Sequence, residues 1–161
     1  EISACLVGSE MCIRDRDNMI AEGPNAIVHD GTIYLIYSGS LVGIDYTTGL
    51  VTAPAGQDAD LTDPNVWTKL DYPLQKSGVY NGQWQLGTGH GMWSNDEDGN
   101  LIYVFHNAEY ENGRYGGRDA QVRRVHWSKE GMPILDMQAA EELNPDYADI
   151  TMKIVVSGNK G

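Results

Sequence analysis

The clearest pattern along the chain is a pair of apolar and aromatic runs separated by two turn residues, in the stretch NAIVHDGTIYLIYSGS (25–40). Runs rich in Ile, Val and Tyr favour β-strands, and Asp-Gly between two such runs is a strong short-range signal for a hairpin. We therefore predict two antiparallel strands that are joined at Asp30-Gly31.

Strand-prone runs separated by turn residues continue towards the end of the chain. Further strands are expected over 46–53, 101–107, 118–127 and 150–158, and one brief helix is expected over 137–143. Turns are expected in 58–69, 95–100 and 128–133, and the chain holds 19 Gly. This order favours an all-β, mainly antiparallel domain. A propeller and a β-sandwich both stay open, because strong repeat self-similarity is not evident.

The first sixteen residues, EISACLVGSEMCIRDR, differ in composition from the rest, since they lack aromatics and hold both cysteines of the chain. The segment resembles a translated adapter artefact that precedes unrelated proteins in assembled sequence collections. We therefore predict that residues 1–16 are not native and leave them out of the fold. Two cysteines are too few for a disulfide framework or a zinc cluster.

Composition and charge narrow the possible partners. The chain is 41% hydrophobic and 21% charged, which is typical of a globular protein, and its formal net charge is −12. Nucleic acids and anionic membrane surfaces both attract basic patches, so we expect neither as a partner. The sequence holds no apolar run of the length that a bilayer span needs.

Glu22 stands directly before the pair Gly23-Pro24, at the start of the first predicted strand. Proline fixes its own φ angle and favours extended geometry in the residue before it, so we expect a stiff corner that holds the neighbouring carboxylate in one direction. A general acid needs such a direction and a partly apolar surrounding. A solvated loop glutamate is the alternative.

A second candidate site is the stretch GQWQLGTGHGMWSN (82–95), in which His90 lies between glycines and is flanked by Trp84 and Trp93. Glycines let the backbone approach a ligand or an ion closely. His90 can orient a catalytic carboxylate, contact a hydroxyl or help to hold a metal, and a structural histidine is the alternative. His106 ends the strand predicted over 101–107 and can face either a pocket or solvent.

Arg118 follows a glycine-rich stretch and enters the strand predicted over 118–127. The planar fork of a guanidinium group can bind a carboxylate or sugar hydroxyls. Arg114, Arg123 and Arg124 lie nearby and compete for that role, and a solvated arginine is the alternative for each.

Four stretches follow one another along the chain: EGPNAIVHDGTIYLIYSGS, DADLTDPNVWTK, GTGHGMWSNDEDGNLIYVFHN and GRDAQVRRVHWSKEGMP. In this order and spacing they resemble the second half of glycoside hydrolase family 43, over about residues 20 to 135. The resemblance implies a five-bladed β-propeller with mainly antiparallel four-stranded sheets. Residues 17–161 are then the C-terminal part of that domain, about its last two to three blades.

The resemblance also implies an activity, which is the inverting hydrolysis of arabinose- or xylose-containing plant polysaccharides or oligosaccharides. Glu22 matches the family's general acid, while His90 and Arg118 match residues of the substrate pocket. We also expect Trp93, beside His90, to bind substrate. The reaction is expected to need no cofactor, and a structural calcium ion is expected near His90, held through water.

Two further carboxylates of the family's mechanism, the base and the aspartate that tunes the acid, precede the Glu-Gly-Pro motif. Only Asp15 and Asp17 precede Glu22 here, and neither has the matching context. We therefore expect this polypeptide to be inactive alone and its full-length parent to be a glycosidase, secreted or periplasmic in a bacterium. The alternatives are a non-catalytic carbohydrate-binding or scaffold propeller and an unrelated β-sandwich module.

Overall fold

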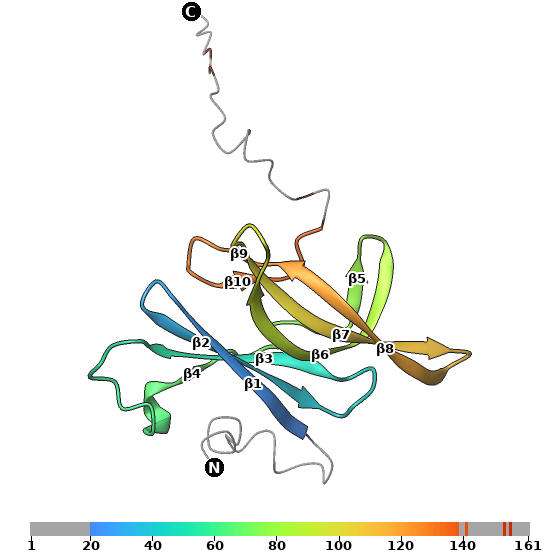
Figure 1. Cartoon of the computed structure of the whole chain (residues 1–161), viewed down its shortest axis with the longest axis horizontal. Helices are drawn as coiled ribbons and strands as arrows, with labels where there is room; N and C mark the ends of the chain where they lie inside the picture. Colours follow the sequence, from blue (N-terminus) through green and yellow to red (C-terminus); the bar gives the residue numbers. More distant parts are fainter. Residues whose placement is uncertain (1–19, 139–140, 142–152, 154, 156–161) are drawn as a thin grey trace, which may run out of the picture.

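The computed structural model describes residues 20–138, 141, 153 and 155, and these residues form an all-β structure (Figure 1). Two four-stranded antiparallel sheets and one two-stranded piece make up the fold. The strands are β1 (Ile20–His29), β2 (Thr32–Ser40), β3 (Thr47–Pro54), β4 (Thr68–Lys69), β5 (Gly78–Tyr80), β6 (Gln83–Asn95), β7 (Leu101–Glu111), β8 (Arg114–Arg124), β9 (His126–Trp127) and β10 (Pro133–Ile134).

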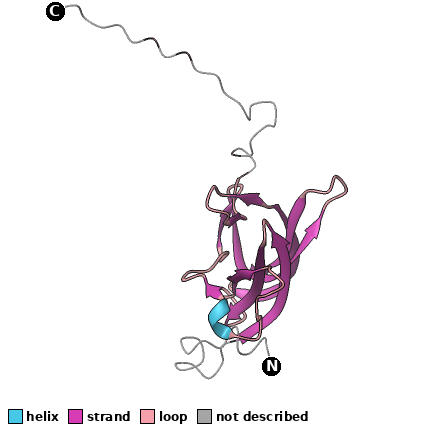
Figure 2. Cartoon of the chain, turned by 90° about the vertical axis from the view of Figure 1, so that its left-hand side faces the viewer, coloured by secondary structure: helices cyan, strands magenta, loops and turns pink. Residues whose placement is uncertain are grey.

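Some of the predicted elements lie outside the described residues. The segment 1–16 and nearly all of the strand expected over 150–158 are among them. The helix expected over 137–143 also falls mostly outside, and Met137 and Gln138 at its start have no regular structure. Strands dominate the described fold, and the 3-10 helix η1 (Pro64–Val66) lies at one end of it (Figure 2).

The first sheet has the strand order β1-β2-β3-β4, and it contains the predicted hairpin. His29 pairs with Thr32 across the turn at Asp30-Gly31. Asp30 has a φ of 44° and Gly31 a φ of 74°, and positive φ at both central positions is the mark of the two-residue hairpin turn that Asp-Gly favours. The prediction of this hairpin is confirmed.

The second sheet has the order β5-β6-β7-β8, and its β6 was not among the predicted strands. Its glycines make room for aromatic rings from elsewhere in the fold. A Cβ atom at Gly89 would lie 2.6 Å from the ring of Tyr46, and one at Gly91 would lie 2.2 Å from the ring of Tyr103. Irregularities in the pairing of β6 with β7 fall on both sides of Gly89. The glycines of β6 thus allow close packing of aromatic rings and do not form a loop.

The core lies between the two sheets and consists of aromatic and aliphatic side chains from both. Its buried members are Tyr34, Ile36, Leu50, Trp93, Tyr103, Phe105, Val125 and Leu135. The Tyr34 hydroxyl donates a hydrogen bond of 2.6 Å to the carbonyl oxygen of Gly131, and thereby ties the first sheet to the turn between β9 and β10. Within the described part of the chain, no helix has the length and apolar character needed to cross a membrane.

Candidate functional site

Glu22 lies in β1 at an irregularity in its pairing with β2, between Glu22 and Asn25. The corner does not have the predicted geometry, because Gly23 has a φ of 62°, in the left-handed region that favours glycine, and is not extended. Glycine has no Cβ atom and adopts such a positive φ readily. A Cβ atom at Gly23 would lie 3.3 Å from Nε2 of His90, so the corner packs directly on that ring.

Tyr46 joins Glu22 to His90. Its ring is 1% exposed, and its hydroxyl donates a hydrogen bond of 2.6 Å to Oε1 of Glu22. The same hydroxyl lies 3.2 Å from Nδ1 of His90. Burial, followed by the hydrogen bond to Glu22, raises the pKa of Tyr46 to about 12. The phenol is therefore protonated throughout the neutral pH range, and it remains a donor.

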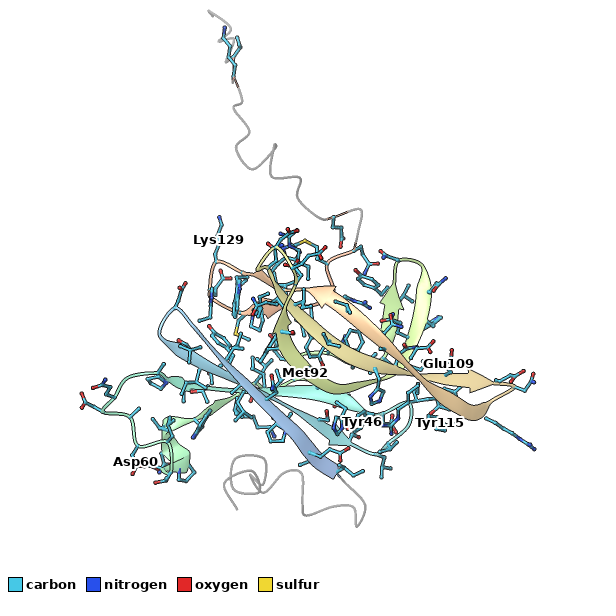
Figure 3. All side chains as sticks on the ribbon, viewed as in Figure 1. Tyr46, Asp60, Met92, Glu109, Tyr115 and Lys129 are labelled. Atoms are coloured by element: carbon cyan, nitrogen blue, oxygen red, sulfur yellow. The ribbon has the colours of Figure 1, made fainter. Side chains whose placement is uncertain are left out.

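Sequence reasoning missed Tyr46. It lies just before β3 in the stretch IDYTTG, which carries no catalytic motif, and its partners are 24 and 44 residues away in the sequence. Tyr46 lies towards the lower right of the view in Figure 3, near the end of the molecule at which β3 begins.

His90 lies on β6 with a φ of 49°, and its backbone N–H donates a hydrogen bond of 2.6 Å to the Ser38 hydroxyl. This bond fixes the bulged strand to β2. The side chain of His90 is 51% exposed and that of Glu22 is 41% exposed, while Nδ1 and Oε1 lie 3.6 Å apart. Both polar groups are thus anchored on one side and open to solvent on the other.

His106 and Arg118 lie in a shallow pocket of about 390 Å³ beside His90. The ring of His106 stacks on that of Tyr46 with centroids 5.6 Å apart. Burial, and then the positive charge of Arg118, lowers the pKa of His106 to about 4. Arg118 is exposed, and its Nε–H donates a hydrogen bond of 2.9 Å to the Tyr115 hydroxyl. The pocket therefore combines a neutral imidazole with an oriented guanidinium group.

Trp93, predicted to bind substrate, lies instead in the core between the sheets. It is 6% exposed, and its indole N–H donates a hydrogen bond of 3.3 Å to the carbonyl oxygen of Tyr34. This placement argues against a contact between Trp93 and substrate. Its neighbour Met92 is 50% exposed and lines the pocket, because successive side chains of a strand face opposite sides of the sheet.

The arginines that compete with Arg118 have other surroundings. Arg123 is 5% exposed and stacks on the ring of Tyr80, with 3.1 Å between its Cζ and the ring centroid. Arg124 donates a hydrogen bond of 2.8 Å to the side-chain oxygen of Asn100. Of Arg118, Arg123 and Arg124, Arg118 is the one that lines the pocket beside His90.

The described residues do not supply a metal cage of their own. Among them, no group of three or more His, Cys, Asp or Glu side chains has the arrangement that could hold a metal ion. Calcium prefers six to eight oxygen ligands, whereas the site around His90 holds one carboxylate, two imidazoles and a guanidinium group. The calcium ion expected near His90 stays a prediction, and no step below depends on it.

Two four-stranded antiparallel sheets pack against each other, His90 and Arg118 line one pocket, and Glu22 lies 3.6 Å from His90. This arrangement is that of part of an all-β propeller domain. The chain belongs to glycosyl hydrolases family 43, because the model of that family matches residues 4–133.

Similar proteins support this assignment. The chain is 31% identical over 134 residues to an extracellular exo-alpha-(1->5)-L-arabinofuranosidase of Streptomyces avermitilis, covering 78% of this chain and 27% of the relative. It is 36% identical over 120 residues to alpha-L-arabinofuranosidase 43 of Humicola insolens, covering 71% and 24%. The crystal structure of an alpha-L-arabinofuranosidase from Lactobacillus brevis superposes with a TM-score of 0.62 at 30% identity, covering 71% of this chain and 36% of that one.

These matches confirm the expected family and the expected all-β fold with antiparallel four-stranded sheets. The chain spans about a quarter of the length of the relatives it matches and about a third of the solved structure. The activity of the whole protein is therefore a matter of proposal.

Proposed function

We propose that the whole protein, of which this chain is a part, is a glycoside hydrolase for arabinose- or xylose-containing plant polysaccharides or oligosaccharides, with Glu22 as general acid. The observation that carries the proposal is the half-exposed Glu22 carboxylate, held on one oxygen by Tyr46 at 2.6 Å and flanked by His90. The relatives named as arabinofuranosidases favour arabinose as the sugar that is released.

In the inverting mechanism that we propose, two carboxylates act on opposite sides of the sugar. Glu22 gives its proton to the glycosidic oxygen as the bond between that oxygen and the anomeric carbon breaks. A water molecule attacks the anomeric carbon from the other face and gives up its proton to a second carboxylate. The two carboxyl groups in such enzymes lie about 6.5–9.5 Å apart, which leaves room for the water.

We propose that the second carboxylate, and the aspartate that tunes the acid, come from outside this chain. Among the residues that the structure describes, no aspartate or glutamate lines the pocket that His90, His106 and Arg118 share. The limited share of the relatives that the chain covers agrees with this view. The isolated 161-residue polypeptide should then be inactive.

We propose that Arg118 and His90 hold the sugar against Glu22. The exposed guanidinium group of Arg118 is oriented by Tyr115 and presents donors to ring hydroxyls or to a carboxylate. His90 presents the open side of its ring at the same pocket. We also propose that the protein is exported, since the relative from Streptomyces avermitilis is named as extracellular.

The test is hydrolysis of arabino- and xylo-oligosaccharides by the whole protein, its Glu22→Gln variant and the isolated chain. The whole protein should release sugar, and Glu22→Gln should lower kcat by about 10²- to 10⁴-fold, the usual contribution of a general acid. Glu130→Gln, in the exposed turn between β9 and β10, is the matched control and should change nothing.

Two results would contradict the proposal. Unchanged turnover in Glu22→Gln would remove the acid from the mechanism, and turnover by the isolated chain would show that no outside carboxylate is needed. Binding of oligosaccharides by the whole protein without release of sugar would favour the non-catalytic carbohydrate-binding alternative.

A further inference from the structure

The hydrogen bonds around Tyr46 allow its single hydroxyl proton to be placed. A phenol carries one proton and can donate only once, although its oxygen can also accept. Tyr46 donates to Oε1 of Glu22 at 2.6 Å, which is shorter than its 3.2 Å contact with His90, and the Ser38 hydroxyl is a third partner that donates to the Tyr46 oxygen. Towards Nδ1 of His90, at 3.2 Å, the oxygen of Tyr46 must then act as the acceptor. In the neutral form of His90, the proton is therefore on Nδ1, and Nε2 carries none.

The same reasoning decides which oxygen of Glu22 gives up the proton. Oε1 accepts the hydrogen bond from Tyr46, whose ring is 1% exposed, so this oxygen faces the interior. The side chain of Glu22 is 41% exposed as a whole, so we infer that Oε2 is the oxygen that faces solvent. A proton on Oε2 faces a leaving group, whereas a proton on Oε1 would face Tyr46.

We propose that Tyr46 is a positioning residue for the general acid. Nδ1–H of His90 donates to the Tyr46 oxygen, and the Tyr46 hydroxyl donates to Oε1 of Glu22. Because Oε1 is then an acceptor, the proton that Glu22 transfers is confined to Oε2. The proposal rests on the proposed function of Glu22 and goes beyond it by naming the oxygen and the residue that selects it. The opposite arrangement, with a proton on Oε1 that points to Tyr46 and a Tyr46 proton that points to Nδ1, would bury the proton that the reaction needs.

A first experiment tests the proton assignment without any activity measurement. In ¹⁵N-histidine-labelled whole protein, at a pH at which the ring of His90 is neutral, its Nδ1 should show the chemical shift of a protonated nitrogen and its Nε2 that of an unprotonated one. The Tyr46→Phe variant should lose this preference, because the acceptor is gone. Protonated Nε2 with unprotonated Nδ1 in the unmodified protein would overturn the proposal.

The second experiment measures kcat and KM of Tyr46→Phe on two kinds of substrate. Phenylalanine keeps the ring that stacks on His106 and removes only the hydroxyl. With a sugar or alkyl alcohol as leaving group, kcat should fall roughly ten- to a hundredfold, the usual worth of a hydrogen bond to a charged group. With a nitrophenol leaving group, which needs little protonation, kcat should change less than about threefold, and KM should stay within about twofold for both.

Tyr34→Phe is the matched control, since it also removes a buried hydroxyl with one long-range hydrogen bond, to Gly131, but away from Glu22. It should lower kcat on the two substrates equally or not at all. If Tyr46→Phe lowers kcat equally on both substrates, Tyr46 has only a structural role and the proposal fails. If kcat falls on neither substrate, the proposal also fails. If Glu22→Gln is itself without effect, the proposed function has failed, and the ¹⁵N measurement still decides the proton assignment.

Discussion

His106 shows how the surroundings of a single side chain set its charge. Its ring lies near those of Tyr46 and His90, with centroids 5.6 Å and 6.5 Å away, and it lines the same pocket as Arg118. Burial disfavours the charged imidazolium, and the nearby cation disfavours it further, so the pKa of His106 falls to about 4. His106 therefore adds no positive charge to the pocket at neutral pH.

The titration of His106 follows from this environment. In the whole protein, its ring proton resonances should stay constant from pH 8 down to about pH 5 and move only as the pH approaches 4. Because the pKa is lower in the folded state than the usual value of about 6.5, the unfolded chain binds a proton first. The contribution of His106 to stability is therefore present above about pH 6.5 and is lost as the pH falls towards 4.

Replacement of Arg118 tests whether its positive charge lowers the pKa of His106. Arg118→Gln should raise the pKa of His106, because it removes a neighbouring cation, while Arg124→Gln on the same strand should leave the titration unchanged. NMR titration of the three proteins provides the measurement. A midpoint of His106 near 6.5 in the unmodified protein would contradict the description of this pocket.

Individual residues also show what the sequence could and could not predict about the site. Glu22, His90 and Arg118 lie in sequence motifs that could be recognised. The structure brings His90 close to Glu22 and into one pocket with Arg118. Tyr46 carries no motif, because its role depends only on contacts across strands. Trp93 was predicted for substrate because it is near His90 in sequence, but the two-residue period of β6 directs it into the core.

The strand β6 carries both the core and the site, and its glycines are what allow it to do so. Gly89 and Gly91 flank His90 and leave room for the rings of Tyr46 and Tyr103. Glycine has a low preference for strands, so the composition of this stretch hid the longest strand among the described residues. The hairpin at Asp30-Gly31, by contrast, was predicted correctly, because its turn residues determine its geometry locally.

A substitution at Gly91 tests this view of β6. Gly91→Ala would place a Cβ atom 2.2 Å from the ring of Tyr103, which is 0% exposed and hydrogen-bonded to Thr48 at 2.7 Å. The whole protein should lose about 1–3 kcal/mol of unfolding free energy, the usual cost of overpacking a core. Denaturant unfolding, at unchanged slope, provides the measurement.

The control is Gly116→Ala in β8, where the nearest atom is the carbonyl oxygen of Glu109 at an ordinary 3.9 Å. That variant should be neutral or slightly stabilising, because alanine restricts the unfolded chain. Equal midpoints for the two variants would show that the ring of Tyr103 does not depend on the absence of a side chain at Gly91.

In the described part of the chain, the two sheets pack against each other, and the other face of the second sheet exposes apolar side chains. Met92, Val104 and Val122 pair across β6, β7 and β8 and form an apolar row, in which Met92 is 50% and Val122 is 55% exposed. Neighbouring blades of a propeller cover such faces, and the relatives are about four times as long as the part that the chain matches. The exposed apolar face and the position of Glu22 beside His90 and Tyr46 thus agree with the larger domain that we propose.

The claim that Glu22 donates the proton to the leaving group is tested most directly by the dependence of kcat/KM on leaving-group acidity. In the whole protein, kcat/KM for a series of aryl pentosides should depend only weakly on the pKa of the leaving phenol, because the acid neutralises the developing charge. In Glu22→Gln the dependence should become steep, with near-normal turnover of the best leaving groups and a loss of about 10²-fold or more for the poorest. Parallel lines for the two proteins would contradict the assignment of Glu22 as the general acid.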